Sequence, residues 1–400
     1  IWMRKLEGRA CESAIRINMT LNQFSFPTTI LHGEGALAEL AERIGEKKLM
    51  LVTDPGLVKA GVVEQALAGL KASAAAFEIF DGVHPNPTEE DVEAGAAFYN
   101  EHDCDGLLGL GGGSAMDVAK VIRFLASHPA PLAQYSVLEN GGSKISANLP
   151  PMYAVPTTAG TGSEVGRGAV ITMRDTGRKT LFVAPPLMPT IAVLEPALTA
   201  GLPPHLTAAT GIDAFTHCLE SYFAPVYHPM ADGVALEGIR LCLAHLGDAV
   251  ADGNDLTARA QMQMAASMGA VAFQKDLGMV HSLAHPLSAR HGTHHGLANA
   301  LMLPDSMAFL EAAELSADQR QRIQTARTLF AEAGRKGDSL SAETRAWFEE
   351  LGIQFGLSNH GITADYLPPL ADEAHADPCH ATNLVSVTRD DLLAVYEAAQ

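Results

Sequence analysis

Apolar and polar positions alternate in two different ways along this chain of 400 residues. Up to about residue 198, short apolar runs of strand length are separated by segments in which apolar residues recur every three to four positions, as on one face of a helix. The runs that predict strands lie at 47–54, 74–83, 104–114, 151–164 and 190–196, and the segments that predict helices between them include 57–73 and 88–103. This alternation predicts a mainly parallel β-sheet covered by helices, which is an α/β domain.

The pattern changes after residue 198. Between residues 199 and 400 the β-branched runs nearly vanish, and segments rich in Ala, Leu and Met follow one another with Pro and Gly between them, which predicts helices. Since a chain of this length can bury two cores, we expect an α/β domain at 19–198 and an all-helical domain at 199–400, with the active cleft between them. Residues 1–18 precede a natural start at Met19 and are predicted to be an extension outside both domains.

The composition argues against several classes of protein. A net charge of −19 disfavours a nucleic-acid partner, because phosphate backbones are bound by clustered Lys and Arg. No apolar stretch approaches the roughly 20 residues that span a bilayer, and residues 1–18 lack the apolar segment of a secretory signal. The five cysteines form no Cys-x-x-Cys pair, which favours reduced thiols. We therefore expect a soluble, cytoplasmic protein without a nucleic-acid or membrane partner.

A glycine-rich segment, GLGGGSAMDVAK at 109–120, follows a predicted buried strand and begins a predicted helix. Glycines let the backbone approach phosphate closely, and free N–H groups at a helix start attract negative charge. The segment is not a complete dinucleotide fingerprint, because Ser114 stands at its third glycine position and no carboxylate follows about 20 residues later. By itself it fits a phosphate-binding loop or a plain turn.

Two further segments end predicted strands, HPNPT at 84–88 and PTTAGTGSE at 156–164. Ligands of open α/β sheets bind along the carboxyl edge of the strands, so the hydroxyl and amide side chains of these segments support a nucleotide site there. Asp54 ends another strand. Its carboxylate could bind ribose hydroxyls and repel an additional phosphate, which would favour NAD(H) over NADP(H), or it could cap the next helix.

The histidines of the second half are unevenly distributed. Asp213 and His217 are four residues apart on a predicted helix and therefore share one face, and His281 and His285 repeat this spacing. A Gly-flanked loop then carries His291, His294 and His295. Three imidazoles and a carboxylate could hold Zn²⁺ or Fe²⁺ with one position open for substrate. The same pairs are also compatible with a polar helix face, and neither matches the His-Glu-x-x-His pattern of metallohydrolases.

Taken together, these segments resemble the iron-containing (group III) alcohol dehydrogenase family. The resemblance runs from about residue 23 to the C-terminus, with six blocks in the family's order: VTDPGL, HPNPT, GGGSAMDVAK, PTTAGTGSEV, LPPHLTAATGIDAFTHCLESY and GMVHSLAHPLSARHGTHHGLANALMLP. It implies an N-terminal dinucleotide-binding domain and a helical C-terminal domain in a dehydroquinate synthase-like architecture. It also implies NAD as cofactor, one divalent metal ion (Fe²⁺ or Zn²⁺) in the cleft, and at least a homodimer.

By position in these blocks, the resemblance implies four metal ligands, Asp213, His217, His281 and His295. It places His285 beside the metal as a non-ligand, where the side chain could relay a proton to solvent or make a structural hydrogen bond. Family members commonly carry Pro before the last ligand, where this chain has His294. The positions implied to contact the cofactor are Asp54, Asn86, Gly111, Gly112, Gly113, Ser114, Thr157, Thr158 and Lys179.

Several segments look most like 4-hydroxybutyrate dehydrogenases, among them SEVGRGAVI, AFQKDLGMVHSLAHPL and the tail HADPCHATN. The predicted reaction is hydride transfer between NAD(H) and a small primary alcohol or aldehyde, with a 4-hydroxybutyrate or succinic semialdehyde type of substrate as the finer hypothesis. Asp276 stands where Gly is expected. Arg167, Lys275 and Arg290 could bind a substrate carboxylate or be solvated surface charges, and Arg167 is favoured because it follows the cofactor loop directly.

Three other functions are compatible with parts of this pattern. The chain could be a related sugar-phosphate cyclase, a metal-free maleylacetate reductase, or a nucleotide-binding protein that performs no turnover. The presence of Asp213 together with His217 and the two later histidines favours the metal-dependent dehydrogenase over each of them.

Overall fold

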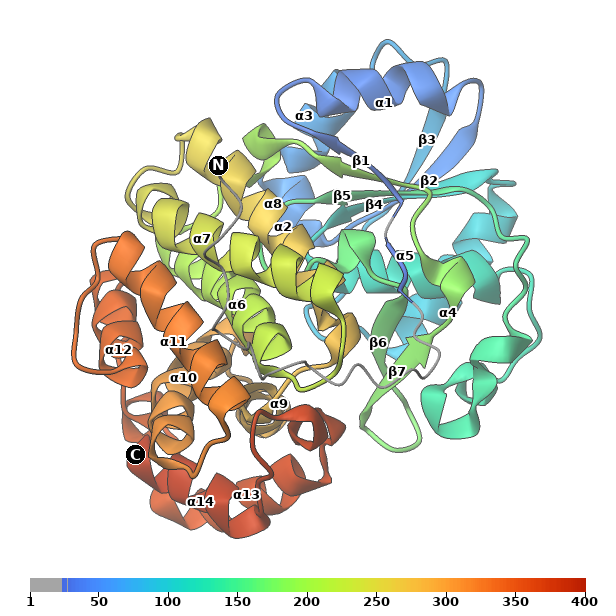
Figure 1. Cartoon of the computed structure of the whole chain (residues 1–400). Helices are drawn as coiled ribbons and strands as arrows, with labels where there is room; N and C mark the ends of the chain where they lie inside the picture. Colours follow the sequence, from blue (N-terminus) through green and yellow to red (C-terminus); the bar gives the residue numbers. More distant parts are fainter. Residues whose placement is uncertain (1–23, 27) are drawn as a thin grey trace, which may run out of the picture.

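The first half of the chain is built around a six-stranded parallel sheet (Figure 1). Its strand order is β1-β8-β5-β4-β2-β3. This computed structural model describes residues 24–26 and 28–400, so the predicted extension at 1–18 lies outside the described residues. A separate antiparallel hairpin consists of β6 and β7. The strands are β1 (Thr29–His32), β2 (Lys48–Val52), β3 (Ala76–Phe80), β4 (Gly106–Gly111), β5 (Met152–Pro156), β6 (Gly168–Thr172), β7 (Lys179–Val183) and β8 (Ile191–Leu194).

The central strands are continuous apolar runs because the sheet is covered on both faces. In β2, Leu49 and Leu51 lie in the core shared with α1 and α3, whereas Met50 and Val52 lie in the core shared with α4 and α5. Successive strand residues point to opposite faces, so one short run supplies both layers. The helices of this half are α1 (Ala36–Ile44), α2 (Pro55–Lys59), α3 (Val62–Gly69), α4 (Glu89–Glu101) and α5 (Gly113–Leu125).

The predicted elements of the first half differ from the structure mainly at their ends. The run at 104–114 was expected to be one strand, but β4 ends at Gly111 and α5 begins at Gly113. The run at 151–164 is a strand only as far as Pro156. The segment 57–73, expected to be one helix, is divided into α2 and α3 at Gly61, whose φ of 76° a non-glycine residue rarely adopts. The short strands β1, β6 and β7 were not predicted.

The second half is helical, as predicted, and its helices enclose one large apolar core. Strand β8 ends at Leu194 and α6 begins at Pro204, and the predicted boundary at 198/199 falls on the 3₁₀ helix Pro196–Thr199 between them. No helix within residues 28–400 is long and apolar enough to cross a membrane. The helices are α6 (Pro204–Phe223), α7 (Pro229–Ala251), α8 (Leu256–Ala272), α9 (Met279–His291), α10 (His295–Ala312), α11 (Ala317–Glu332), α12 (Leu340–Glu350), α13 (Leu367–Ala376) and α14 (Arg389–Ala398).

The two halves meet along the segment that follows β5. A Cβ atom added at Gly160 would lie 2.9 Å from Cβ of Thr210 on α6, and one added at Gly162 would lie 2.2 Å from Cβ of Ala270 on α8. Both distances are too short for a side chain, so these glycines allow the end of the sheet to pack directly on the helices. The carboxyl edge of the sheet is thereby fixed next to the middle of α6.

Candidate metal centre and cofactor site

Four of the predicted site residues converge from three helices. Asp213 and His217 lie one turn apart on α6, His281 lies in the first turn of α9, and His295 is the first residue of α10. Their ligand atoms all lie within 4.8 Å of one another. The side chains of Asp213, His217 and His281 are buried, and His295 is partly exposed.

One carboxylate oxygen is the common neighbour of the three imidazoles. Oδ1 of Asp213 lies 3.4 Å from Nε2 of His295, 3.7 Å from Nε2 of His281 and 3.8 Å from Nε2 of His217. The pocket therefore presents three ring nitrogens and one anionic oxygen to the same point. This is the donor set that Zn²⁺ and Fe²⁺ accept in proteins.

The charges in this pocket favour a cation. Burial alone raises the pKa of Asp213, but the three imidazoles outweigh it and hold that pKa well below its usual value. Burial lowers the pKa of His217 to about 4 and that of His295 well below its ordinary value, so both rings are neutral at pH 7 and offer lone pairs. Burial also opposes the charged form of His281, but hydrogen bonds with Asp213 and Glu220 raise its pKa to about 9.

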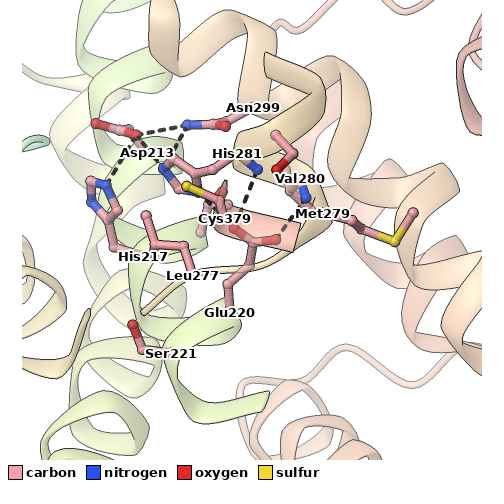
Figure 2. A network of polar contacts seen from close by, with 12 residues as sticks. Asp213, His217, Glu220, Ser221, Leu277, Met279, Val280, His281, Asn299 and Cys379 are labelled. Atoms are coloured by element: carbon pink, nitrogen blue, oxygen red, sulfur yellow. Dashed lines mark hydrogen bonds and ion pairs between the residues drawn. The ribbon is translucent and has the colours of Figure 1, made fainter. Parts of the chain in front are cut away.

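Glu220, which the sequence analysis did not single out, orients one of these imidazoles (Figure 2). Its Oε2 lies 2.6 Å from Nδ1 of His281, and its Oε1 accepts a hydrogen bond of 2.7 Å from the N–H of Val280. Gly278 precedes α9 and brings no capping side chain, so Glu220 satisfies the free N–H groups of the first turn. A Cβ at Gly278 would lie 2.7 Å from Oε1 of Glu220, which explains why glycine stands there.

Asn299 is the second residue that the sequence analysis missed. Its amide nitrogen donates to Oδ1 of Asp213 at 2.8 Å and lies 3.4 Å from Nε2 of His281 (Figure 2). The same nitrogen lies 3.4 Å from Nε2 of His295. Spacing carried a signal for both missed residues, because Glu220 follows His217 by three positions and Asn299 follows His295 by four. Either spacing places two side chains on one face of a helix.

The other histidines of the cluster take different positions. His285 donates from Nδ1 to Asp377 across 2.8 Å, and its ring stacks on His295 with ring centroids 5.4 Å apart. His291 ends α9 and packs against Tyr366, while His294 precedes α10. Within the described part of the chain, only His295 of the three loop histidines joins Asp213.

The glycine-rich loop lies at the carboxyl edge of the sheet. Gly111 ends β4 with a φ of 152°, Gly112 is the N-cap of α5, and Gly113 begins that helix. A Cβ at Gly113 would lie 3.0 Å from Cγ2 of Thr161, and one at Gly112 would lie 3.7 Å from the side chain of Thr158. The loop therefore faces the segment after β5, and the N–H groups at the start of α5 are suited to bind phosphate.

The remaining predicted cofactor residues surround this loop. Thr157 donates its N–H to the carbonyl of Gly111 at 3.0 Å, and the hydroxyl of Ser114 donates to the carbonyl of Pro85 at 2.7 Å. Asn86 is exposed in the segment that Ser114 contacts. Lys179 begins β7 and pairs with Thr172, which bridges to Thr88 at the end of the same segment.

Asp54 has one of the two roles that its sequence position allowed, the capping of α2, and it also lies beside the glycine-rich loop. Its Oδ1 accepts the N–H groups of Gly56 at 2.8 Å and Leu57 at 3.1 Å and so caps α2. Its other oxygen, Oδ2, lies 4.0 Å from the position that a Cβ of Gly111 would occupy. One carboxylate oxygen thus caps the helix while the other faces the glycine-rich loop.

The three cations proposed to bind a substrate carboxylate differ in their surroundings. Lys275 is fully buried and forms an ion pair with Asp232, so the structure favours a structural role for it over substrate binding. Arg290 pairs with Glu373 on the surface. Arg167 is exposed after the cofactor segment and forms no ion pair within residues 28–400.

Two family models match the chain in succession. The model described as iron-containing alcohol dehydrogenase matches residues 27–196, and the C-terminal model of the Fe-containing alcohol dehydrogenase family matches residues 207–400. The 4-hydroxybutyrate dehydrogenase of Cupriavidus necator is 43% identical over 349 residues, which cover 86% of this chain and 89% of that protein. The 1,3-propanediol dehydrogenase of Klebsiella pneumoniae is 34% identical over 398 residues, covering 95% of this chain and 100% of that protein.

Solved structures agree with these matches. A 1,3-propanediol oxidoreductase superimposes with a TM-score of 0.86 at 33% identity, covering 95% of this chain and 100% of the other. A sulfoacetaldehyde reductase from Bifidobacterium kashiwanohense, determined in complex with NAD⁺, superimposes with a TM-score of 0.84 at 28% identity, covering 95% and 99%. The predicted architecture and family resemblance are thereby confirmed.

Proposed function

Because this chain belongs to the iron-containing alcohol dehydrogenase family, we propose that it transfers a hydride between NAD(H) and a small primary alcohol or the corresponding aldehyde. The observation that carries the proposal is the convergence of one carboxylate and three imidazoles from α6, α9 and α10. Helix α6 packs next to the carboxyl edge of the parallel sheet, where ligands of α/β proteins bind, and α10 packs on both α6 and α9.

A divalent cation, Fe²⁺ or Zn²⁺, fits the donor set formed by Asp213, His217, His281 and His295. Two of the rings are neutral at pH 7 and the carboxylate is ionised, as ligands must be. When bound, the cation polarises the substrate oxygen and stabilises the negative charge that develops on it. Glu220 keeps Nε2 of His281 directed into the pocket, because its carboxylate accepts the proton on Nδ1.

His285 is the group that we propose to exchange a proton between the substrate hydroxyl and solvent. Its ring stacks on the proposed ligand His295, and 43% of its side chain is exposed. The side chain therefore reaches both the pocket and water. Imidazole is suited to this task because its proton affinity lies near the working pH.

The cofactor is proposed to lie along the carboxyl edge of the sheet. The N–H groups at the start of α5 would bind the pyrophosphate, and Oδ2 of Asp54 would accept a ribose hydroxyl. The negative charge of Asp54 would repel an additional phosphate there, which favours NAD(H) over NADP(H). The structural neighbour that was determined in complex with NAD⁺ supports NAD(H) as the cofactor.

For the substrate we propose a short ω-hydroxy acid or its semialdehyde, of the 4-hydroxybutyrate type. The support is the 43% identity to a 4-hydroxybutyrate dehydrogenase and the exposed guanidinium of Arg167, which has no ion-pair partner among the described residues and could bind a distal carboxylate. A neutral diol is the second candidate, because a 1,3-propanediol dehydrogenase covers nearly the whole chain.

The metal centre is tested by comparing His295→Ala with His294→Ala. Metal content after reconstitution with Fe²⁺ or Zn²⁺, and oxidation of NADH with an aldehyde, should both be lost in His295→Ala and retained in His294→Ala. Equal behaviour of the two variants would contradict the proposed ligand set. A wild-type protein that holds metal and NADH but turns over no C3 to C6 aldehyde would contradict the proposed reaction.

The substrate class is tested with Arg167→Ala. Its kcat/KM for succinic semialdehyde should fall more than tenfold, since a charge-assisted pair is worth about 1.5–3 kcal/mol. Its kcat/KM for butanal, a neutral aldehyde of similar length, should stay within a factor of two. Equal losses on the two aldehydes would exclude recognition of the carboxylate by Arg167.

A further inference from the structure

Asp377 makes the only protein hydrogen bond of the His285 side chain within the described part of the chain. Its Oδ2 accepts the Nδ1–H of His285 at 2.8 Å, although the two residues are 92 positions apart in the sequence. Asp377 precedes the short 3₁₀ helix Pro378–Thr382, in a segment that packs on α9. A tail segment far from the metal ligands therefore reaches the edge of the pocket.

Asp377 is itself held in place by two further hydrogen bonds. Its Oδ1 accepts the hydroxyl proton of Ser282 at 2.9 Å and the N–H of Cys379 at 2.9 Å. Ser282 in turn accepts the N–H of His380 at 2.8 Å. Burial alone raises the pKa of Asp377, but the hydrogen bond with His285 and these donors outweigh it and hold the pKa well below its usual value. The side chain is therefore a carboxylate, which only accepts hydrogen bonds.

A carboxylate acceptor determines which nitrogen of His285 carries a proton when the ring is neutral. The proton must be on Nδ1, so Nε2 keeps its lone pair. The same bond also limits rotation of the ring, which is stacked on His295 with an interplanar angle of 15° and lies edge-on to His281. Without Asp377, nothing else among the described residues would select this tautomer.

We propose that Asp377 is a positioning residue for the reaction, which fixes the orientation and the Nδ1–H tautomer of His285 beside the metal centre. The inference rests on the proposed function, in which His285 exchanges the substrate proton. Ser282 and the N–H of Cys379 hold Oδ1 of Asp377, which leaves Oδ2 directed at His285. The tail segment 377–380 thus belongs to the active site, although it holds none of the proposed metal ligands.

His285, Asp377 and Cys379 are also close enough to one another to hold a cation themselves. The hydrogen bonds favour the positioning role, because both oxygens of Asp377 already accept protons from Nδ1, a hydroxyl and a backbone N–H. A bound cation would have to displace the Nδ1 proton. Metal content of the variants below separates the two possibilities.

The activity test compares Asp377→Ala, Asp377→Asn and the control Asp372→Ala in the reconstituted enzyme. Asp372 lies on α13 and pairs on the surface with Arg389, so its loss changes the charge equally without contacting His285. We expect kcat to fall 10- to 100-fold in Asp377→Ala and not in Asp372→Ala. We expect a loss in Asp377→Asn too, because its single amide oxygen stays with the N–H of Cys379 and its NH2 then faces Nδ1 of His285. The KM for NADH should stay within a factor of two throughout.

A double variant separates positioning from general destabilisation. If Asp377 acts through His285, adding Asp377→Ala to His285→Gln should cause no further loss of kcat, whereas independent effects multiply. A further loss in the double variant would overturn the proposal. Loss of a second metal equivalent in Asp377→Ala, with one equivalent retained, would identify a cation site instead.

A spectroscopic measurement tests the tautomer without relying on turnover. In metal-free protein, ¹⁵N NMR of the histidine rings should show His285, identified by the signal missing in His285→Gln, as the Nδ1–H tautomer. In Asp377→Ala the Nε2–H form should become the major one. Wild-type protein with the Nε2–H form would overturn the inference even if the enzyme is active, and the expected tautomer in an inactive protein would instead contradict the proposed function.

Discussion

The carboxylate of Glu220 and the imidazole of His281 meet across two helices, with Oε2 2.6 Å from Nδ1. The other oxygen of the same carboxylate accepts the N–H of Val280 in the first turn of α9. One buried side chain therefore caps the helix that carries a proposed ligand and selects the ring nitrogen that faces the pocket. The start of α9 and the geometry of the proposed metal centre depend on the same group.

Replacing this carboxylate should weaken both metal binding and the start of α9. In Glu220→Gln an amide oxygen that accepts the Nδ1 proton carries no charge, so the imidazole binds a metal ion less strongly, and the NH2 group faces the N–H of Val280 and cannot accept it. We expect affinity for Zn²⁺ to fall on the order of tenfold, measured by competition with a chelator. Glu237→Gln, which removes an exposed partner of Arg240, is the matched control and should leave affinity unchanged. Equal affinity of Glu220→Gln and wild type would show that the charge of Glu220 does not tune the ligand.

Metal binding should depend on pH through His281. In the metal-free protein the pKa of His281 is about 9, so at pH 7 both ring nitrogens are protonated. A metal ion needs the lone pair of Nε2, so binding must release this proton, and affinity should rise about tenfold per pH unit from pH 7 to 9 and level off above that. His217, with a pKa of about 4, is already neutral over this range and therefore does not contribute to the change of metal affinity with pH.

Calorimetry in two buffers of different ionisation enthalpy measures the released proton directly. We expect release of about one proton at pH 7.5 and almost none at pH 10. In Glu220→Gln the plateau of affinity should begin at a lower pH, because the carboxylate that raises the pKa of His281 is gone. A metal affinity of wild-type protein that does not change between pH 7 and 9 would rule out a charged His281 in the metal-free pocket.

Asp54→Asn isolates the charge of Asp54 from its capping role. Asn is as good an N-cap as Asp, so the hydrogen bonds to Gly56 and Leu57 should persist and the melting temperature should change little. Removal of the negative charge should lower the ratio of kcat/KM for NADH over NADPH by about tenfold, the effect of about 1.4 kcal/mol of repulsion. Kinetics with the two cofactors measure the ratio, and an unchanged ratio would exclude Asp54 as the discriminating group.

Lys275→Met should affect stability without affecting substrate choice. The ammonium is fully buried beside Asp232, and Arg322 also contacts this carboxylate, with Nη2 3.3 Å from Oδ2. Breaking a buried ion pair costs about 3–5 kcal/mol of stability when the remaining charge has no partner. Because Arg322 still contacts Asp232, we expect the free energy of unfolding to fall by about 3 kcal/mol or less. Urea denaturation measures it. A selective loss of activity on succinic semialdehyde over butanal would instead assign Lys275 to the substrate.

The sequence by itself determined the fold class and the family, and it predicted the residue types of the proposed metal centre. Apolar runs without alternation predicted a sheet buried on both faces, and the spacing of Asp213 and His217 predicted a shared helix face, because both signals are local and depend only on backbone periodicity. Breaks between elements were less predictable. Gly61 divides one amphipathic segment into two helices through a positive φ, which periodicity does not register.

Only the tertiary structure decided which polar groups meet. His294 and His295 are adjacent in sequence, and the start of α10 determines that His295 joins Asp213. Lys275 and Arg167 carry the same charge, but packing buries Lys275 against Asp232 and leaves Arg167 exposed. Glu220 reaches His281 across 61 positions and Asp377 reaches His285 across 92. Such contacts depend on how whole helices pack, and no local pattern of residues encodes a distance between segments so far apart in the chain.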